Sequence, residues 1–245
     1  MFGFHHCTKL FEFVLQQDWD DLLFRLEQYP NEAHHWETVQ FDGQHETRLL
    51  PLHQVCALDP PLRVVEALLK AYPEATHKHD IYFHRVPLHI ATSRAASAEV
   101  VKIVLAAAPG AAKQQDALGR VPLHYAVFSH DSLEIILTLI RTYPAGIKVM
   151  DYKGWLPIHV ACRCGTTLPI MRALLESYPR STLRTTTGGM TPLECAERFG
   201  VLNEECKALL RQITLERQAS SSDVNENCQP SQEPLVPPEP PMAQT

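Results

Sequence analysis

The sequence predicts an all-α fold, a solenoid of helix-turn-helix units with projecting loops, followed by a disordered C-terminal tail. A four-residue phrase, Leu/Val-Pro-Leu-His with small variations, occurs five times, and its fourth residues are 36, 35, 35 and 35 positions apart. A second phrase, Tyr-Pro or Ala-Pro, follows it with spacings of 36, 35 and 35. Two phrases that keep one period indicate stacked structural repeats. The first phrase occupies residues 50–53, 86–89, 121–124, 156–159 and 191–194.

Each unit is predicted to contain two helices. The proline of the first phrase suits the first position of a helix, where its missing N–H has no intrahelical partner to lose. Paired aliphatic residues follow the histidine with the spacing of one helical stripe, as in Ile135, Ile136, Leu139 and Ile140. The next proline, here Pro144, is predicted to end that second helix.

A polar turn precedes each first helix. Asp116 and Gly119, then Asp151 and Gly154, recur 35 residues apart, just before the Pro-Leu-His phrase. Asp and Gly are typical turn residues. We therefore expect a hairpin-like loop that projects from each unit.

This pattern resembles the ankyrin repeat, whose signature is Thr-Pro-Leu-His-x-Ala within about 33 residues. His89–Ala91, His124–Ala126 and His159–Ala161 follow the signature directly, whereas most units carry Leu or Val in place of its Thr. The resemblance implies five repeats over residues 42–213, at about 42–77, 78–113, 114–148, 149–183 and 184–213.

The repeat phrases also assign structural roles. Thr191 and Glu194 form a Thr-x-x-Glu capping box, while packing is expected to carry the helix starts that lack the Thr. Family resemblance suggests that each repeat histidine bonds the backbone of the adjoining loop. Because equivalent residues advance by one repeat, these rings should form a ladder and not a metal site. The histidines concerned are His53, His89, His124 and His159.

Both ends of the array are expected to differ from its middle, because terminal repeats need one face that tolerates water. Residues 1–41 are predicted to form a capping helix pair and to enter an enlarged loop at Trp36–Thr47. Residues 214–245 are rich in Pro, Glu and Ser and cannot bury enough apolar surface to offset their ordering entropy. A disordered tail is the prediction for them.

Composition limits the partners and the location. The net charge of −6 and the absence of Lys/Arg clusters argue against nucleic-acid binding. No stretch has the length of a membrane span. Seven scattered cysteines, an odd number, fit no disulfide framework. We expect a monomeric protein inside the cell, in the cytoplasm, with the nucleus as the alternative.

Catalytic and metal-binding motifs are weak. Cys162-Arg163-Cys164 is a single Cys-x-Cys motif, which supplies two of the four ligands that a closed zinc site requires. Further zinc ligands would have to come from His5, His6 and Cys7, or from His34 and His35. Residues 185–189 resemble a phosphate loop only superficially, because the Gly-Lys-Ser/Thr end is missing. No cofactor, metal or catalytic residue is predicted.

The leading functional prediction is a non-catalytic module that binds another protein as an adaptor, scaffold or inhibitor. The alternative is a substrate-recruiting subunit of an enzyme complex such as a ubiquitin ligase, and a metal protein or enzyme comes third. The resemblance implies binding through loop tips and the concave inner-helix face, where exposed aromatic and basic residues contribute most. The candidates are Tyr82, Phe83, Arg85, Arg120, Tyr152, Lys153 and Trp155 in the loops, and Tyr125, Phe128 and Arg163 on the inner helices.

Overall fold

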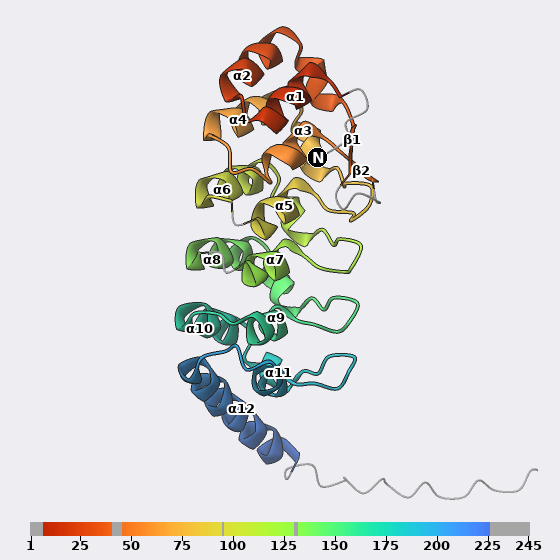
Figure 1. Cartoon of the computed structure of the whole chain (residues 1–245). Helices are drawn as coiled ribbons and strands as arrows, with labels where there is room; N and C mark the ends of the chain where they lie inside the picture. Colours follow the sequence, from red (N-terminus) through yellow and green to blue (C-terminus); the bar gives the residue numbers. More distant parts are fainter. Residues whose placement is uncertain (1–6, 41–45, 95, 130–131, 226–245) are drawn as a thin grey trace, which may run out of the picture.

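The computed structural model describes residues 7–40, 46–94, 96–129 and 132–225, with side chains up to residue 220. Figure 1 shows a stack of helix pairs with loops projecting on one side, which confirms the predicted helical solenoid. The inner helices, next to the loops, are α1 (Lys9–Gln16), α3 (Pro51–Val55), α5 (Pro87–Ser93), α7 (Pro122–Phe128), α9 (Pro157–Cys164) and α11 (Pro192–Phe199). The outer helices are α2 (Trp19–Gln28), α4 (Leu62–Ala71), α6 (Ala98–Ala107), α8 (Leu133–Thr142), α10 (Leu168–Ser177) and α12 (Glu204–Asn225).

The outer helices bury the stripe of paired aliphatic residues. In α8, Ile135, Ile136 and Leu139 are at most 3% exposed and belong to one continuous apolar core that runs through the stack. Tyr143 caps the end of this helix, and Pro144 then opens a short 3-10 turn. The sequence predicted where these helices stop but not the turns that follow them. These turns are η1 (Pro30–His34), η2 (Pro73–His77), η3 (Pro109–Lys113), η4 (Pro144–Lys148) and η5 (Pro179–Leu183).

The inner helices α3, α5, α7 and α9 begin with proline at the first position, and a histidine completes each start. In α7 the backbone N–H of Val121, the capping residue, donates to Nδ1 of His124 at 3.3 Å. The imidazole thus takes the part that Glu plays in a capping box. In α11 that part belongs to Glu194, whose carboxylate accepts from the N–H of Thr191 at 2.7 Å. The sequence suggested that packing would carry the helix starts that lack Thr, and these histidine hydrogen bonds correct that expectation.

The projecting loops before α5, α7 and α9 are each built around a buried aspartate. Asp116 Oδ1 accepts the backbone N–H groups of Leu118 and Arg120, both at 2.8 Å. Gly119 has a φ of +77°, which only glycine adopts without strain. The next loop is attached by one backbone hydrogen bond, from the N–H of Tyr152 to the carbonyl of Leu118 at 2.9 Å. The loops therefore lie side by side in register (Figure 1).

The N-terminal end differs from the predicted loop. Strands β1 (Glu37–Gln40) and β2 (Glu46–Leu49) form an antiparallel pair in which Glu37 faces Leu49. Val39 and Leu49 pack with Phe11 of α1 in a small separate core. The fold is therefore helical with one hairpin, which covers the first helix of the array.

The C-terminal prediction needs a correction at its boundary. Helix α12 continues to Asn225, so residues 214–225 are helical and the tail does not begin at 214. The end of the helix is polar: Gln212 donates to the carboxylate of Glu216, and Ser220 donates to the carbonyl of Glu216. A long solvated helix needs no apolar stripe in its last turns, so a composition rule for disorder does not identify it. Residues 226–245 lie outside the described part of the chain.

Four buried histidines join each repeat to the next. His124 Nε2 lies 3.0 Å from the carbonyl oxygen of Trp155, which belongs to the following loop. Because Nδ1 accepts from Val121, Nε2 must carry the proton and donate. His89 makes the equivalent bond to the carbonyl of Arg120 at 3.1 Å. His53 and His159 instead lie 2.9 and 3.2 Å from the carbonyl oxygens of Lys78 and Arg184, which come earlier in the following repeat.

Burial keeps these imidazoles neutral. Removal from water lowers the pKa of His53, His89 and His159 to about 4 and also lowers that of His124. A neutral ring is required, because an imidazolium could not accept the N–H bond at Nδ1. The hydrogen bond from Nε2 to the next repeat and the helix cap at Nδ1 therefore both depend on the neutral ring with its proton on Nε2.

The free energy of unfolding should fall between pH 7 and pH 5. Each of the three histidines with a folded pKa of about 4 should contribute a loss of about 2 kcal/mol, since the unfolded ring binds a proton near its ordinary pKa of about 6.5 while the folded ring does not. Stability is thus complete above pH 6.5 and declines until pH 4.

Urea unfolding at several pH values measures this slope. His89→Gln should reduce the slope, whereas replacing the exposed His34 by Gln should leave it unchanged. The chosen range lies above the ordinary pKa of carboxyl groups. An unfolding free energy that is constant from pH 7 to pH 5 would contradict neutral, buried rings.

Candidate functional site

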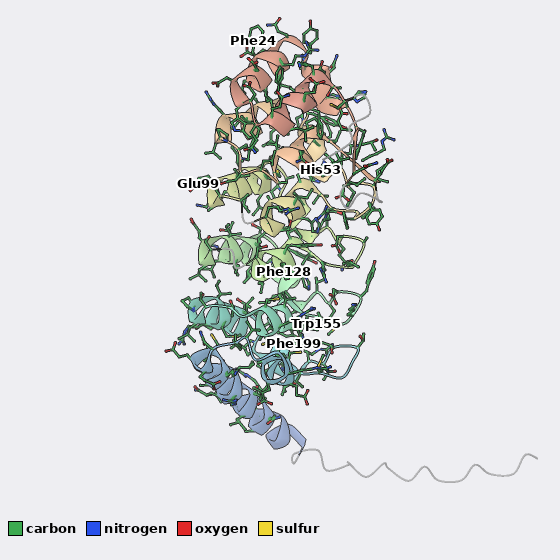
Figure 2. The ribbon with its side chains drawn as sticks, in the orientation of Figure 1. Phe24, His53, Glu99, Phe128, Trp155 and Phe199 are labelled. Atoms are coloured by element: carbon green, nitrogen blue, oxygen red, sulfur yellow. The ribbon has the colours of Figure 1, made fainter. Side chains whose placement is uncertain are left out.

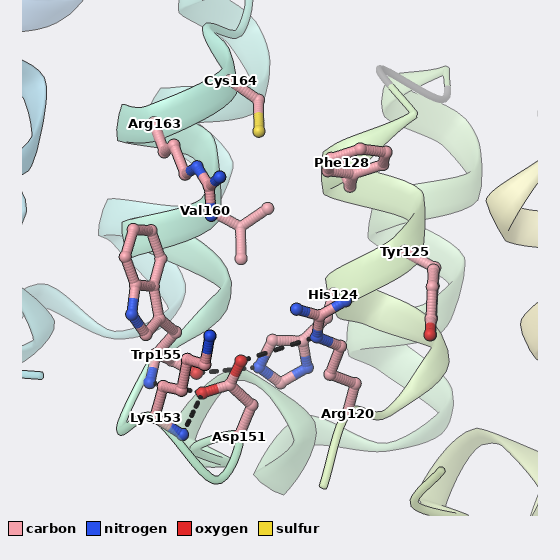
Figure 3. Close-up of a pocket in the computed structure, with 10 residues that line it drawn as sticks. All are labelled: Arg120, His124, Tyr125, Phe128, Asp151, Lys153, Trp155, Val160, Arg163 and Cys164. Atoms are coloured by element: carbon pink, nitrogen blue, oxygen red, sulfur yellow. Dashed lines mark hydrogen bonds and ion pairs between the residues drawn. The ribbon is translucent and has the colours of Figure 1, made fainter. Parts of the chain in front are cut away.

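The main candidate site is a hollow between α7, α9 and the two loops before them, with a cavity volume of about 240 Å³. Figure 3 shows side chains from both helices facing this space, with the loop residues closing its lower end. The residues that line it are Arg120, His124, Tyr125, Phe128, Asp151, Lys153, Trp155, Val160, Arg163 and Cys164.

Six of the ten predicted partner-binding residues meet in this hollow: Arg120, Tyr125, Phe128, Lys153, Trp155 and Arg163. Of the remaining four, Phe83 and Arg85 line a second hollow near the N-terminal hairpin, about 210 Å³ in volume. Tyr82 and Tyr152 line neither and lie on the loop surface, 46% and 72% exposed.

Two buried aspartates position residues that line the hollow. Asp151 Oδ1 accepts the N–H groups of Lys153 and Trp155 at 2.8 and 2.9 Å, and its Oδ2 lies 3.5 Å from Arg120 Nε. Asp116 Oδ2 accepts the phenol of Tyr125 at 2.5 Å. Burial and this bond to a carboxylate raise the pKa of Tyr125 to about 12. The carboxylates are therefore used within the loops, while the basic side chains are more exposed.

Trp155 corrects the sequence-based prediction. Its exposed fraction is 9%, so it is not an exposed loop tip, and its ring is part of the continuous core. The ring lies 6.2 Å from the ring of Phe199 and 5.4 Å from the guanidinium of Arg163. Trp155 occupies the loop position held by Arg120 one repeat earlier, but an indole at this position can fold inward onto the next inner helix. It supports the hollow from below.

Basic groups dominate the open side. The lining residues include Arg120, Lys153 and Arg163 against Asp151, a formal charge of +2 (three positive groups minus one). Lys153 and Arg163 are exposed, and neither forms an ion pair with another described residue. Phe128, at the upper end of α7, is 57% exposed. The hollow thus presents positive charge beside apolar surface.

Sequence reasoning missed Val160 and Cys164 in this lining. Val160 directly follows its repeat histidine, as Tyr125 follows His124, so the repeat register was the signal that could have identified it. Cys164 holds the last position of α9, one turn beyond that residue. Neither side chain is aromatic or positively charged, which is why a search by residue type passed over them.

The residues considered for metal binding have other roles. His34 stacks on Tyr72 with ring centroids 4.0 Å apart, and His35 lies 3.6 Å from Glu37. Over the described ranges, no three His, Cys, Asp or Glu side chains are grouped to hold a metal ion. His5 and His6 lie outside those ranges.

The cysteines and the Gly-rich turn also serve the fold. Burial raises the pKa of Cys56 to about 12 and raises that of Cys162, which disfavours the reactive thiolate. In residues 185–189, which superficially resemble a phosphate loop, the hydroxyl of Thr186 accepts from the N–H of Met190, and the N–H of Thr187 donates to the carbonyl of Lys153. This segment is the last of the repeat loops.

The family model for ankyrin repeats (3 copies) matches residues 52–151. The chain therefore contains ankyrin repeats. Ankyrin repeats are generally protein-protein interaction modules and typically non-catalytic. No curated protein matches the chain. A search of the described residues finds no helix that could cross a membrane.

Two substitutions in one loop of this ankyrin array should differ sharply in their effect on stability. Trp155→Ala should lower the free energy of unfolding by about 3 to 5 kcal/mol, because it empties space in the core. Tyr152→Ala should change it by about 0.5 kcal/mol or less, since Tyr152 is 72% exposed. Urea unfolding of both variants measures the difference. Equal losses would mean that Trp155 does not support the core.

Proposed function

We propose that this ankyrin-repeat protein acts as a non-catalytic adaptor, scaffold or inhibitor that binds a partner protein. The binding surface would be the face made by the inner helices and the loops, with residues 42–213 as the binding unit. The observation that carries the proposal is the convergence of Arg120, Phe128, Lys153 and Arg163 on one hollow of that face. Aromatic and Arg side chains are enriched among the residues that contribute most to protein interfaces.

The dimensions of the hollow favour a protein ligand. Its volume of about 240 Å³ lies below the roughly 300 to 1,000 Å³ typical of small-molecule sites. It suits a side chain that projects from a larger partner. A second hollow of about 210 Å³ on the same side, around α3 and α5, would extend the contact along the array.

The exposed aromatic residues give a direct test. We expect Phe128→Ala/Tyr152→Ala to lose partner proteins that the unaltered chain retains from cell extract, because both side chains are exposed on the proposed face. Affinity purification with protein identification measures this. Trp155 is unsuitable as a probe, since its loss disturbs the core.

A matched control removes two exposed aromatic side chains at the first outer helix, away from the proposed face. Phe24→Ala/Tyr29→Ala removes the same two residue types, 67% and 52% exposed, from the region of the first outer helix. Figure 2 places Phe24 at the N-terminal end of the stack and Phe128 near its middle. The control should retain the partners. Retention by both variants, with unchanged circular dichroism, would refute the proposed face.

A further inference from the structure

The hollow between α7 and α9 carries features that define the chemistry of its ligand. We call Arg120, Phe128, Lys153 and Arg163 the basic groove, after its charge. We propose that the basic groove binds an extended acidic segment of the partner protein, in which a carboxylate side chain stands beside an apolar one. This inference rests on the proposed function and specifies the class of ligand for that site.

Arg163 is held ready for a carboxylate. Its guanidinium lies 5.4 Å from the ring centroid of Trp155 and 5.5 Å from that of Phe199. A guanidinium held beside aromatic rings by cation–π contacts keeps its N–H groups for other partners, and these groups match the two oxygens of a carboxylate. Arg163 makes no side-chain hydrogen bond or ion pair with the residues that the structure describes.

Lys153 adds an exposed positive charge at the loop end of the groove. Its backbone is fixed, because its N–H donates to Asp151 and its carbonyl accepts from Thr187, whereas its ammonium forms no ion pair within the described ranges. The side chain of Arg120 makes a long contact to Asp151 at 3.5 Å and lies over the ring of Tyr125, with its guanidinium 5.9 Å from the ring centroid. The charge of +2 among the lining residues contrasts with −6 for the whole chain. An anionic segment would be drawn to this face in preference to the rest of the surface.

The groove also has an apolar side, so the ligand needs an apolar side chain as well as a negative charge. Phe128 is 57% exposed, and Val160 lies on the facing helix in the same hollow (Figure 3). An apolar side chain of the ligand would cover Phe128 while the carboxylate reaches Arg163. Nucleic acid fits less well, because its affinity needs many phosphate contacts and the groove offers two unpaired basic groups.

Selection from a phage library of random twelve-residue peptides by the full chain tests the inference. The selected peptides should be enriched in Asp or Glu next to an aliphatic or aromatic residue. The affinity of the most enriched peptide, measured by fluorescence anisotropy, should fall at least about tenfold in Lys153→Glu/Arg163→Glu, because two attractive contacts become repulsive. Binding should also weaken as salt is raised.

Charge-matched controls separate the groove from the general charge of the protein. Arg141→Glu/Arg172→Glu makes the same change in net charge at exposed positions of α8 and α10 and should leave the affinity unchanged. Thermal melts establish that each variant is folded. Peptides without acidic enrichment, no enriched peptide at all, or equal losses in both variants would overturn the inference. If peptides without acidic residues bind and depend on Phe128, the proposed function survives and the acidic ligand does not.

The acidic C-terminal segment of the chain itself is the competing occupant. Replacing Glu226, Glu233 and Glu239 by Gln in the full chain should leave peptide affinity unchanged. A rise of about tenfold or more would assign the groove to this segment and overturn the commitment to a partner protein.

Discussion

In four successive repeats one neutral imidazole connects three parts of the structure, at His53, His89, His124 and His159. Its Nδ1 completes the start of an inner helix, and its Nε2 holds the carbonyl of a loop that belongs to the next repeat. The ring is buried, so both bonds form away from water, where leaving either partner unpaired would cost about 1 to 3 kcal/mol. Helix start, loop position and repeat spacing are therefore fixed together, and each repeat is aligned with the following one.

This alignment determines the chemistry of the groove. Because His124 of α7 fixes the carbonyl of Trp155, the loop after α8 is held against α7, and the indole packs beneath Arg163 of α9. Asp151 is used to fold that loop, so its negative charge is buried while Lys153 is exposed. A nearly regular array thus carries a local excess of positive charge. The excess arises because the aspartate is buried in hydrogen bonds within its loop, whereas Lys153 and Arg163 are exposed.

The repeat period predicted the architecture, because positions in register share one environment in a stacked array. It also placed the groove residues on neighbouring repeats, with Phe128 and Arg163 at equivalent positions of α7 and α9 and Arg120 and Lys153 on successive loops. Rules for single residue types failed in three places. The burial of Trp155 depends on space beside Phe199, the hairpin at Glu37–Leu49 depends on covering Phe11, and α12 continues to Asn225 through local polar hydrogen bonds. Each of these outcomes is set by a tertiary or local contact that composition does not encode.

The state of the four buried rings is the central claim of this account. Two-dimensional ¹⁵N NMR of the imidazole nitrogens at pH 7 reports directly which nitrogen carries the proton. Our account predicts neutral rings with the proton on Nε2 for His53, His89, His124 and His159, with slowly exchanging Nε2 protons. Rings protonated at Nδ1, or imidazolium at neutral pH, would contradict the bridge between repeats and the placement of the groove that depends on it.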